Sequence, residues 1–153
     1  MNIPSPLPLE LEELSRTLVD SAFKVHQTLG PGLLESVYEA CLCIELGKRG
    51  IGYETQAPIP LIYEGVRIDA GLRLDLLVEK NVILELKSVD KLLPVHQSQL
   101  LTYLKLADLR LGLLVMAKPV CPAQLQRRHV QARRSANYSL THILPCVGPS
   151  SCI

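Results

Sequence analysis

The stretch RLDLLVEKNVILELK, residues 73–87, decides the fold that we expect. Two apolar runs flank Glu79-Lys80-Asn81, which predicts antiparallel strands over residues 72–78 and 82–88 joined by a tight turn. When the turn is centred on Lys80, residues whose numbers sum to 160 oppose one another. Burial favours this register, because a one-residue slip would turn the apolar side chains toward solvent. The apolar pairs on one face are Leu74 with Leu86, Leu76 with Leu84, and Val78 with Val82.

The other face of the predicted hairpin carries charged side chains. Its pairs are Leu77 with Ile83, Asp75 with Glu85, and Arg73 with Lys87. Directly opposed carboxylates repel one another, and a divalent cation such as Mg²⁺ (or Mn²⁺) would offset that repulsion because it prefers oxygen ligands. Lys87 lies two residues beyond Glu85, hence on the same face, where its ammonium would orient an attacking water. The Leu86 carbonyl between them would add a metal ligand.

This charged face also has a simpler explanation. Exposed strands often carry acids and bases that only contact solvent. The residues alone therefore leave two interpretations open, a metal site and a solvated face.

Hydrophobic periodicity predicts the elements around the hairpin. Helices are expected over residues 9–29, 34–49 and 93–107, and short strands near residues 59–63 and 66–68. A continuous apolar run predicts a final buried strand over residues 109–116. Beyond Lys118 the sequence suggests a basic helix over residues 122–134 and a loose tail over residues 145–153. We therefore expect one domain over residues 1–118 and a basic, proline-punctuated extension over residues 119–153 that is not an independent domain.

Composition narrows the class of protein. A hydrophobic fraction of 48% and a charged fraction of 20% are ordinary for a globular protein. No apolar run is long enough to cross a membrane and no secretory signal is visible, so we expect a cytoplasmic protein without a membrane partner. Five cysteines without a CxxC spacing favour free thiols over an iron–sulfur cluster.

Charge is distributed unevenly along the chain. Residues 1–108 hold 10 Lys and Arg against 15 Asp and Glu, whereas residues 109–153 hold six cations and no acid. A basic tail can follow a phosphate backbone, and it can equally be a solvated end. The candidate nucleic-acid contacts are Arg73, Arg127, Arg128, Arg133 and Arg134.

Several blocks of the chain together resemble a known family. The motif Gly32-Leu33-Leu34-Glu35-Ser36-Val37-Tyr38 is similar to the motif that names the GxxExxY family, a bacterial and archaeal group in the PD-(D/E)XK nuclease superfamily. The blocks that accompany it, in the family's order, are His26–Glu35 (before and through the motif), Arg73–Val78, Leu84–Lys87 and Gln99–Lys105. The resemblance covers roughly residues 10–116, and the chain after that departs from the usual family ending.

The resemblance implies a fold and a site. The fold would be α/β, with a restriction-endonuclease-like αβββαβ core, a small mixed sheet and an extra N-terminal helix. Asp75 and Glu85 would be metal ligands, Lys87 the catalytic lysine, and Glu35 a further acid at the metal. Gln99 and Tyr103 match a QxxxY pattern that helps to shape such sites in exonuclease members.

Structural or surface roles, without a part in catalysis, remain open for several of these residues. An acid such as Glu35 in a first helical turn complements the helix dipole, and Gln99 could be a surface residue. Tyr38 fits packing better than chemistry, and structural or exposed roles fit His26 and His96.

Our leading hypothesis is a magnesium-dependent hydrolase of phosphodiester bonds, acting on DNA more readily than on RNA. The alternative is a non-catalytic nucleic-acid-binding or protein-assembly module on the same fold. A homodimer is left open.

Overall fold

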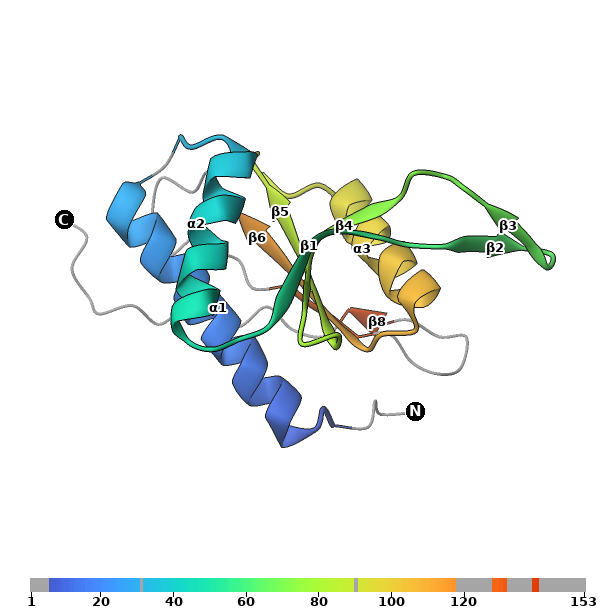
Figure 1. The fold of residues 1–153 in the computed structure, drawn as a ribbon, viewed down its shortest axis with the longest axis horizontal. Coiled ribbons are helices and arrows are strands. Elements are labelled where there is room, and N and C mark those ends of the chain that lie inside the picture. Colours follow the sequence, from blue (N-terminus) through green and yellow to red (C-terminus); the bar gives the residue numbers. More distant parts are fainter. Residues whose placement is uncertain (1–5, 31, 90, 118–127, 132–138, 141–153) are drawn as a thin grey trace.

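The computed structural model describes residues 6–30, 32–89, 91–117, 128–131 and 139–140 (Figure 1). The helices are α1 (Leu9–Leu29), α2 (Glu35–Lys48) and α3 (Pro94–Ala107). The strands are β1 (Tyr53–Pro58), β2 (Leu61–Tyr63), β3 (Val66–Ile68), β4 (Arg73–Val78), β5 (Val82–Lys87), β6 (Leu111–Met116), β7 (Arg128–Gln131) and β8 (Ser139–Leu140). Among the described residues, no helix is both long enough and apolar enough to cross a membrane.

The main sheet is mixed, and within the described ranges it has six strands in the order β1-β4-β5-β6-β7-β8. Among the strands that the structure describes, only β5 and β6 pair in parallel, and α3 makes the connection between them. The succession α2, β1, β4, β5, α3, β6 is the expected αβββαβ core, with α1 as the extra N-terminal helix and the β2–β3 hairpin inserted between β1 and β4. The predicted fold class is therefore confirmed.

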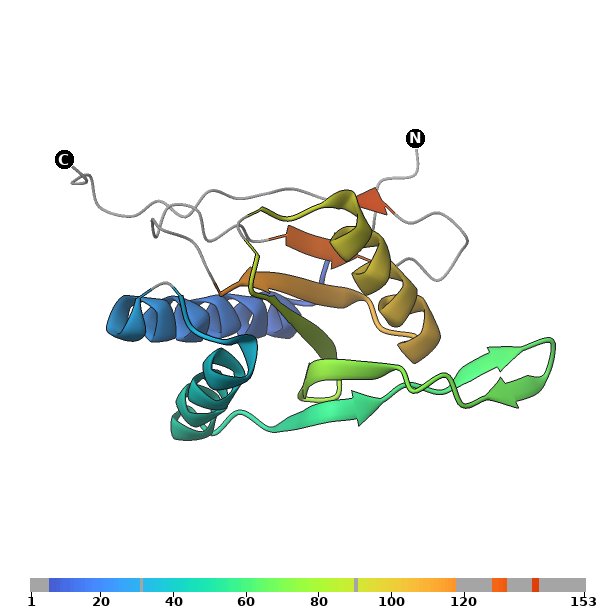
Figure 2. The same cartoon turned by 90° about the horizontal axis from the view of Figure 1, so that it is seen from above.

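Helices cover both faces of this sheet (Figures 1 and 2). Buried residues of α1 and α2 pack with one set of strand side chains, and residues of α3 pack with the other set. β6 is buried along its whole length, as its continuous apolar run predicts for an inner strand. Gly112 of β6 leaves room for α3, because a Cβ there would lie 2.7 Å from Leu100 Cδ1.

The β4–β5 hairpin has the predicted register, but only in the half of its length next to the turn. Leu76 pairs with Leu84, Leu77 with Ile83, and Val78 with Val82, and the paired ladder stops there. The three predicted pairs beyond it are wrong: Leu74–Leu86, Asp75–Glu85 and Arg73–Lys87 are not part of the ladder. Leu74 packs on the α3 side of the sheet, whereas Leu76 and Val78 pack on the α1–α2 side. The alternation of β4 side chains between the two faces of the sheet therefore shifts by one residue around Asp75.

Three other expectations need correction. β1 (Tyr53–Pro58) was not predicted as a strand, because five of its six residues are exposed and its pattern does not alternate. β6 is not the final strand, since β7 and β8 extend the sheet beyond it. Residues 128–131, placed in a predicted basic helix, form a strand antiparallel to β6. The rest of that predicted helix and the tail over residues 145–153 lie outside the described residues.

Candidate active site

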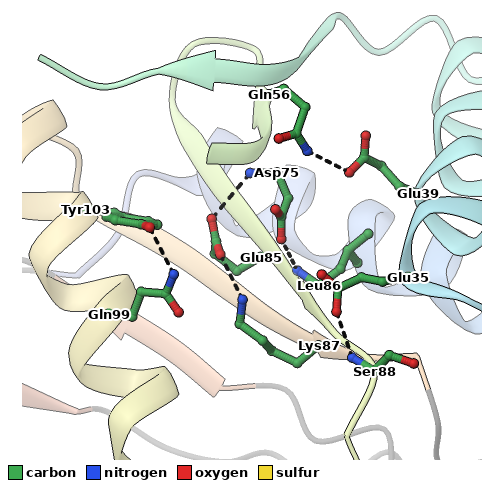
Figure 3. A network of polar contacts seen from close by, with 10 residues as sticks. All are labelled: Glu35, Glu39, Gln56, Asp75, Glu85, Leu86, Lys87, Ser88, Gln99 and Tyr103. Atoms are coloured by element: carbon green, nitrogen blue, oxygen red, sulfur yellow. Dashed lines mark hydrogen bonds and ion pairs between the residues drawn. The ribbon is translucent and has the colours of Figure 1, made fainter. Parts of the chain in front are cut away.

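The opened end of the β4–β5 hairpin brings Asp75 and Glu85 together through the backbone (Figure 3). The Asp75 backbone N–H donates to Glu85 Oε1 at 3.3 Å, and the Leu86 N–H donates to Asp75 Oδ2 at 2.8 Å. Each carboxylate therefore accepts a bond from the opposite strand where a ladder would use a carbonyl. This exchange explains why the paired ladder ends and why the two acids still face each other.

Glu85 is a buried acid held between another acid and a lysine. Its side chain is 2% exposed, and its Oε2 lies 3.3 Å from Lys87 Nζ. Burial, and secondly the charge of Asp75, raises the pKa of Glu85 to about 7, whereas Lys87 lowers it. A cation near Asp75 and Glu85 would stabilise both ionised carboxylates, which is the electrostatic condition of a metal site.

The first turn of α2 joins the same site. Glu35 is its first residue, and Glu35 Oε2 accepts a bond from the Ser88 N–H, just beyond β5, at 2.9 Å. Gly32 precedes it with φ of +97°, a left-handed conformation that favours glycine. Tyr38 is fully buried, and its hydroxyl donates to the Ala22 carbonyl of α1 at 2.7 Å. The expectation that Tyr38 packs is confirmed. Of the three motif positions, Gly32 forms a turn, Glu35 makes a carboxylate contact and Tyr38 makes a helix–helix contact.

Glu39 is an acid of this site that the sequence reasoning missed. It lies one helical turn after Glu35, and Figure 3 shows Glu39 reaching Gln56 beside Asp75, whereas Glu35 reaches the end of β5. Burial raises the pKa of Glu39, a hydrogen bond from Gln56 lowers it, and the charges of Asp75 and Glu35 raise it. The four-residue spacing from Glu35 was the signal that could have identified it.

Gln56 connects Glu39 to Arg73. Its Nε2 donates to Glu39 Oε2 at 3.0 Å, and its backbone carbonyl accepts a bond from Arg73 Nη1 at 3.1 Å. Gln56 has φ of +51° and stands opposite Asp75 in the β1–β4 register, at the position where no pair forms. The guanidinium of Arg73 is thus engaged within the arm formed by β1 and β4.

α3 supplies the opposite wall. Gln99 Nε2 donates to the Tyr103 hydroxyl at 2.9 Å, and Tyr103 is 9% exposed. Figure 3 shows this pair on the other side of Glu85 from Glu35 and Glu39. His96 has a structural contact, since its Nδ1 accepts a bond from the Leu93 N–H at the start of α3. His26 is buried on the α1 side of the core.

Other candidate residues are less well defined. Within the described residues, no three His, Cys, Asp or Glu side chains converge closely enough to hold a metal ion as they stand. Cys41 and Cys43 are free thiols. Arg128 opens β7, but its side chain is not described. The residues outside the described ranges are Arg127, Arg133, Arg134, Cys121, Cys146 and Cys152.

The arrangement nevertheless fits a hard cation in its donor chemistry. Mg²⁺ takes one or two carboxylates and keeps water and phosphate oxygens as its other ligands. A carboxylate has about four acceptor positions on two oxygens, so a bond to a backbone amide leaves acceptor capacity. Asp75 and Glu85 therefore have capacity for a cation without breaking the contacts that position them.

The model of the PD-(D/E)XK nuclease superfamily matches residues 12–128, most of the chain. The chain belongs to this superfamily. The match begins within α1 and covers every element from α2 to β6, in agreement with the αβββαβ core. PD-(D/E)XK nucleases act on nucleic acids and typically use divalent metals, so a nuclease fold and a nucleic-acid substrate class follow from membership. No curated protein and no solved structure matches the chain.

Proposed function

We propose that this PD-(D/E)XK protein is a Mg²⁺- or Mn²⁺-dependent phosphodiester hydrolase that acts on DNA, and that it belongs to the GxxExxY group. The observation that carries the proposal is the contact set of Asp75, Glu85 and Lys87. Two acids from neighbouring strands exchange backbone bonds, and the ammonium of Lys87 lies 3.3 Å from Glu85.

Asp75 and Glu85 would hold the cation, with Glu35 and the Leu86 carbonyl as further ligands. The bound cation would supply charge to a phosphoryl oxygen and lower the pKa of a water. Burial makes this position favourable for a cation. Glu85 is almost fully buried, so its ionised form depends on nearby positive charge. Glu39, on the same face of α2 as Glu35, adds negative potential to the position.

Lys87 would orient the attacking water and stabilise charge in the transition state. Its side chain is 16% exposed, so the ammonium is shielded yet accessible from solvent. Gln99 and Tyr103 would support the substrate from α3, because their mutual hydrogen bond fixes both side chains. Arg73 and the basic residues of the chain's end (Arg127, Arg128, Arg133 and Arg134) would contact phosphates.

We further propose that residues 1–118 form the nuclease domain and that residues 119–153 are a basic extension of it. The pairing of β7 with β6 supports an extension that adds to the sheet rather than a separate domain.

Metal titration by calorimetry tests the site without depending on turnover. Wild-type protein is expected to release binding heat with Mn²⁺ and Mg²⁺, and Asp75→Ala is expected to abolish it. Asp69→Ala is the matched control, since Asp69 is an exposed acid between β3 and β4. Equal heats for wild type and Asp75→Ala would contradict the proposed ligands.

A cleavage assay tests the chemistry. Lys87→Ala is expected to lower the rate on single- or double-stranded DNA by about 100- to 10,000-fold, the usual contribution of a positioned catalytic group. Lys91→Ala, which changes an exposed lysine, should leave the rate unchanged. RNA of the same sequence should be cleaved less. Salt-sensitive DNA binding that survives chelator and Glu85→Gln, without cleavage, would support the non-catalytic binding module instead.

A further inference from the structure

The β2–β3 hairpin projects from the body of the molecule (Figures 1 and 2). β2 and β3 form a two-stranded sheet of their own, joined by the two-residue turn Glu64-Gly65. Both turn residues have positive φ, +48° and +78°, as a type I′ hairpin turn requires. The hairpin is therefore locally well specified, but it has no third strand among the described residues.

Apolar side chains are exposed on this hairpin. The exposed fractions are 63% for Ile62, 65% for Tyr63, 64% for Val66 and 42% for Ile68. An isolated two-stranded hairpin is marginally stable in water, and its outer edges offer unpaired N–H and C=O groups. The hairpin would gain stability if another strand were added to it.

The charges of the hairpin disfavour a phosphate backbone as that partner. The charged residues of the hairpin are Glu64 and Arg67, and the acid Asp69 follows directly after β3, which gives two acids and one base. A surface that binds a nucleic-acid backbone needs an excess of Lys and Arg. A protein strand with complementary charges fits better.

The alternation of the ladder identifies which groups of β3 face outward. Residues that flank a two-residue turn form a hydrogen-bonded pair, and the pairs alternate from there. Tyr63 opposes Val66 next to the turn, so Val66 and Ile68 direct their backbone groups toward β2. Arg67, and Asp69 if the strand is extended, direct theirs to the open edge.

We propose that β3 pairs antiparallel with β3 of a second copy of this chain, with Ile68 opposite Ile68 at a two-fold axis. Outward-facing residues must pair with outward-facing residues, so few registers are allowed. Placing Arg67 opposite Arg67 opposes like charges. Centring on Ile68 instead opposes each Arg67 to Asp69 of the other copy, which gives two ion pairs. A lone charge on an edge discourages pairing, whereas these opposite charges select one register.

The expected association is weak. Two short edges bury less surface than the roughly 1,200–2,000 Å² of a stable interface. The hairpin pair therefore gives a concentration-dependent dimer, in which each hairpin becomes part of a four-stranded sheet.

Sedimentation velocity of the full chain tests the proposal, at concentrations up to about 100 µM because interfaces of this size are weak. Wild type is expected to shift from monomer to dimer across the series. Arg67→Asp and Asp69→Arg each replace attraction by repulsion and should weaken the dimer about tenfold or more. The double variant restores opposite charges and should recover dimerisation.

Arg49→Asp is the matched control, because it makes the same change of charge at the exposed end of α2. Circular dichroism checks that each variant is folded. Three results would overturn the proposal: a monomeric wild type throughout, a dimer unaffected by Arg67→Asp, or a double variant no better than either single one. If the wild type is monomeric and Arg67→Asp binds DNA more weakly than the wild type does, the hairpin would be assigned to substrate binding instead. None of these results depends on nuclease activity.

Discussion

The two hairpins of this protein, β4–β5 and β2–β3, have similar turns and opposite surroundings. Each turn contains two residues with positive φ, Glu79-Lys80 in one and Glu64-Gly65 in the other. β4–β5 lies between β1 and β6 with helices on both faces, whereas β2–β3 is solvated on both faces. A turn sets local register, but only a hairpin held by neighbours can open its ladder and give backbone amides to carboxylates.

Truncation of one buried and one exposed side chain measures this difference directly. Leu84→Ala in β5 should lower the free energy of unfolding by about 2–5 kcal/mol, because it leaves a cavity at a fully buried position. Ile62→Ala in β2 should change it by less than about 0.5 kcal/mol, since the side chain is 63% exposed. Urea unfolding measures both. Equal losses would mean that β2–β3 is as much part of the core as β4–β5.

The pH dependence of stability sharpens the contrast at Glu85. Its pKa is raised to about 7 in the folded state, so the folded protein keeps a proton that the unfolded chain releases above its ordinary pKa of 4.5. The stabilising effect is complete below pH 4.5 and is lost as pH rises through about 7. The loss amounts to at most roughly 3 kcal/mol.

Urea unfolding in the presence of chelator, across this pH range, measures the effect. Glu85→Gln should flatten the decline, because the amide has no proton to lose. Glu64→Gln, at the turn of the exposed hairpin, is the control and should keep the wild-type slope. Mg²⁺ should recover stability at the alkaline end in the wild type and in Glu64→Gln, but not in Glu85→Gln. A wild-type slope retained in Glu85→Gln would assign the pH dependence to another group.

The contrast between buried and exposed strands also explains which features the sequence could predict. Apolar residues at Leu76, Val78, Val82 and Leu84 are buried, so their alternation was sufficient to predict the register of β4–β5. The end of the ladder was not predictable, because it depends on carboxylates that replace carbonyls as partners of backbone amides. The sequence pattern of strand residues carries no signal for that exchange.

Elements whose partners are distant in the chain were also mispredicted. β7 has a basic sequence that suggested a helix, and its strand conformation comes from pairing with β6, some 17 residues before it. β1 is mostly exposed, so its pairing with β4 has no apolar alternation to reveal it. Glu39 is different, because its spacing from Glu35 was visible in the sequence and only its importance was overlooked.

Gln56 lies on the arm that joins the two hairpins, and its substitution should have the smallest effect. Gln56→Gly keeps the positive φ without strain and removes the amide that bonds Glu39. Metal affinity should fall by about tenfold, the lower range for a residue that orients a ligand or a neighbouring acid. The hydrogen bond from Gln56 lowers the pKa of Glu39, so its loss raises that pKa.

The deficit in Gln56→Gly should therefore be larger in acidic than in alkaline buffer, where Glu39 is ionised with or without its partner. Calorimetric titration with Mn²⁺ at two pH values measures this difference. Glu54→Gly, two residues earlier on the exposed part of β1, is the matched control for added backbone freedom. A loss of affinity equal at both pH values would mean that Gln56 acts through the geometry of β1, and that its bond to Glu39 does not influence the site.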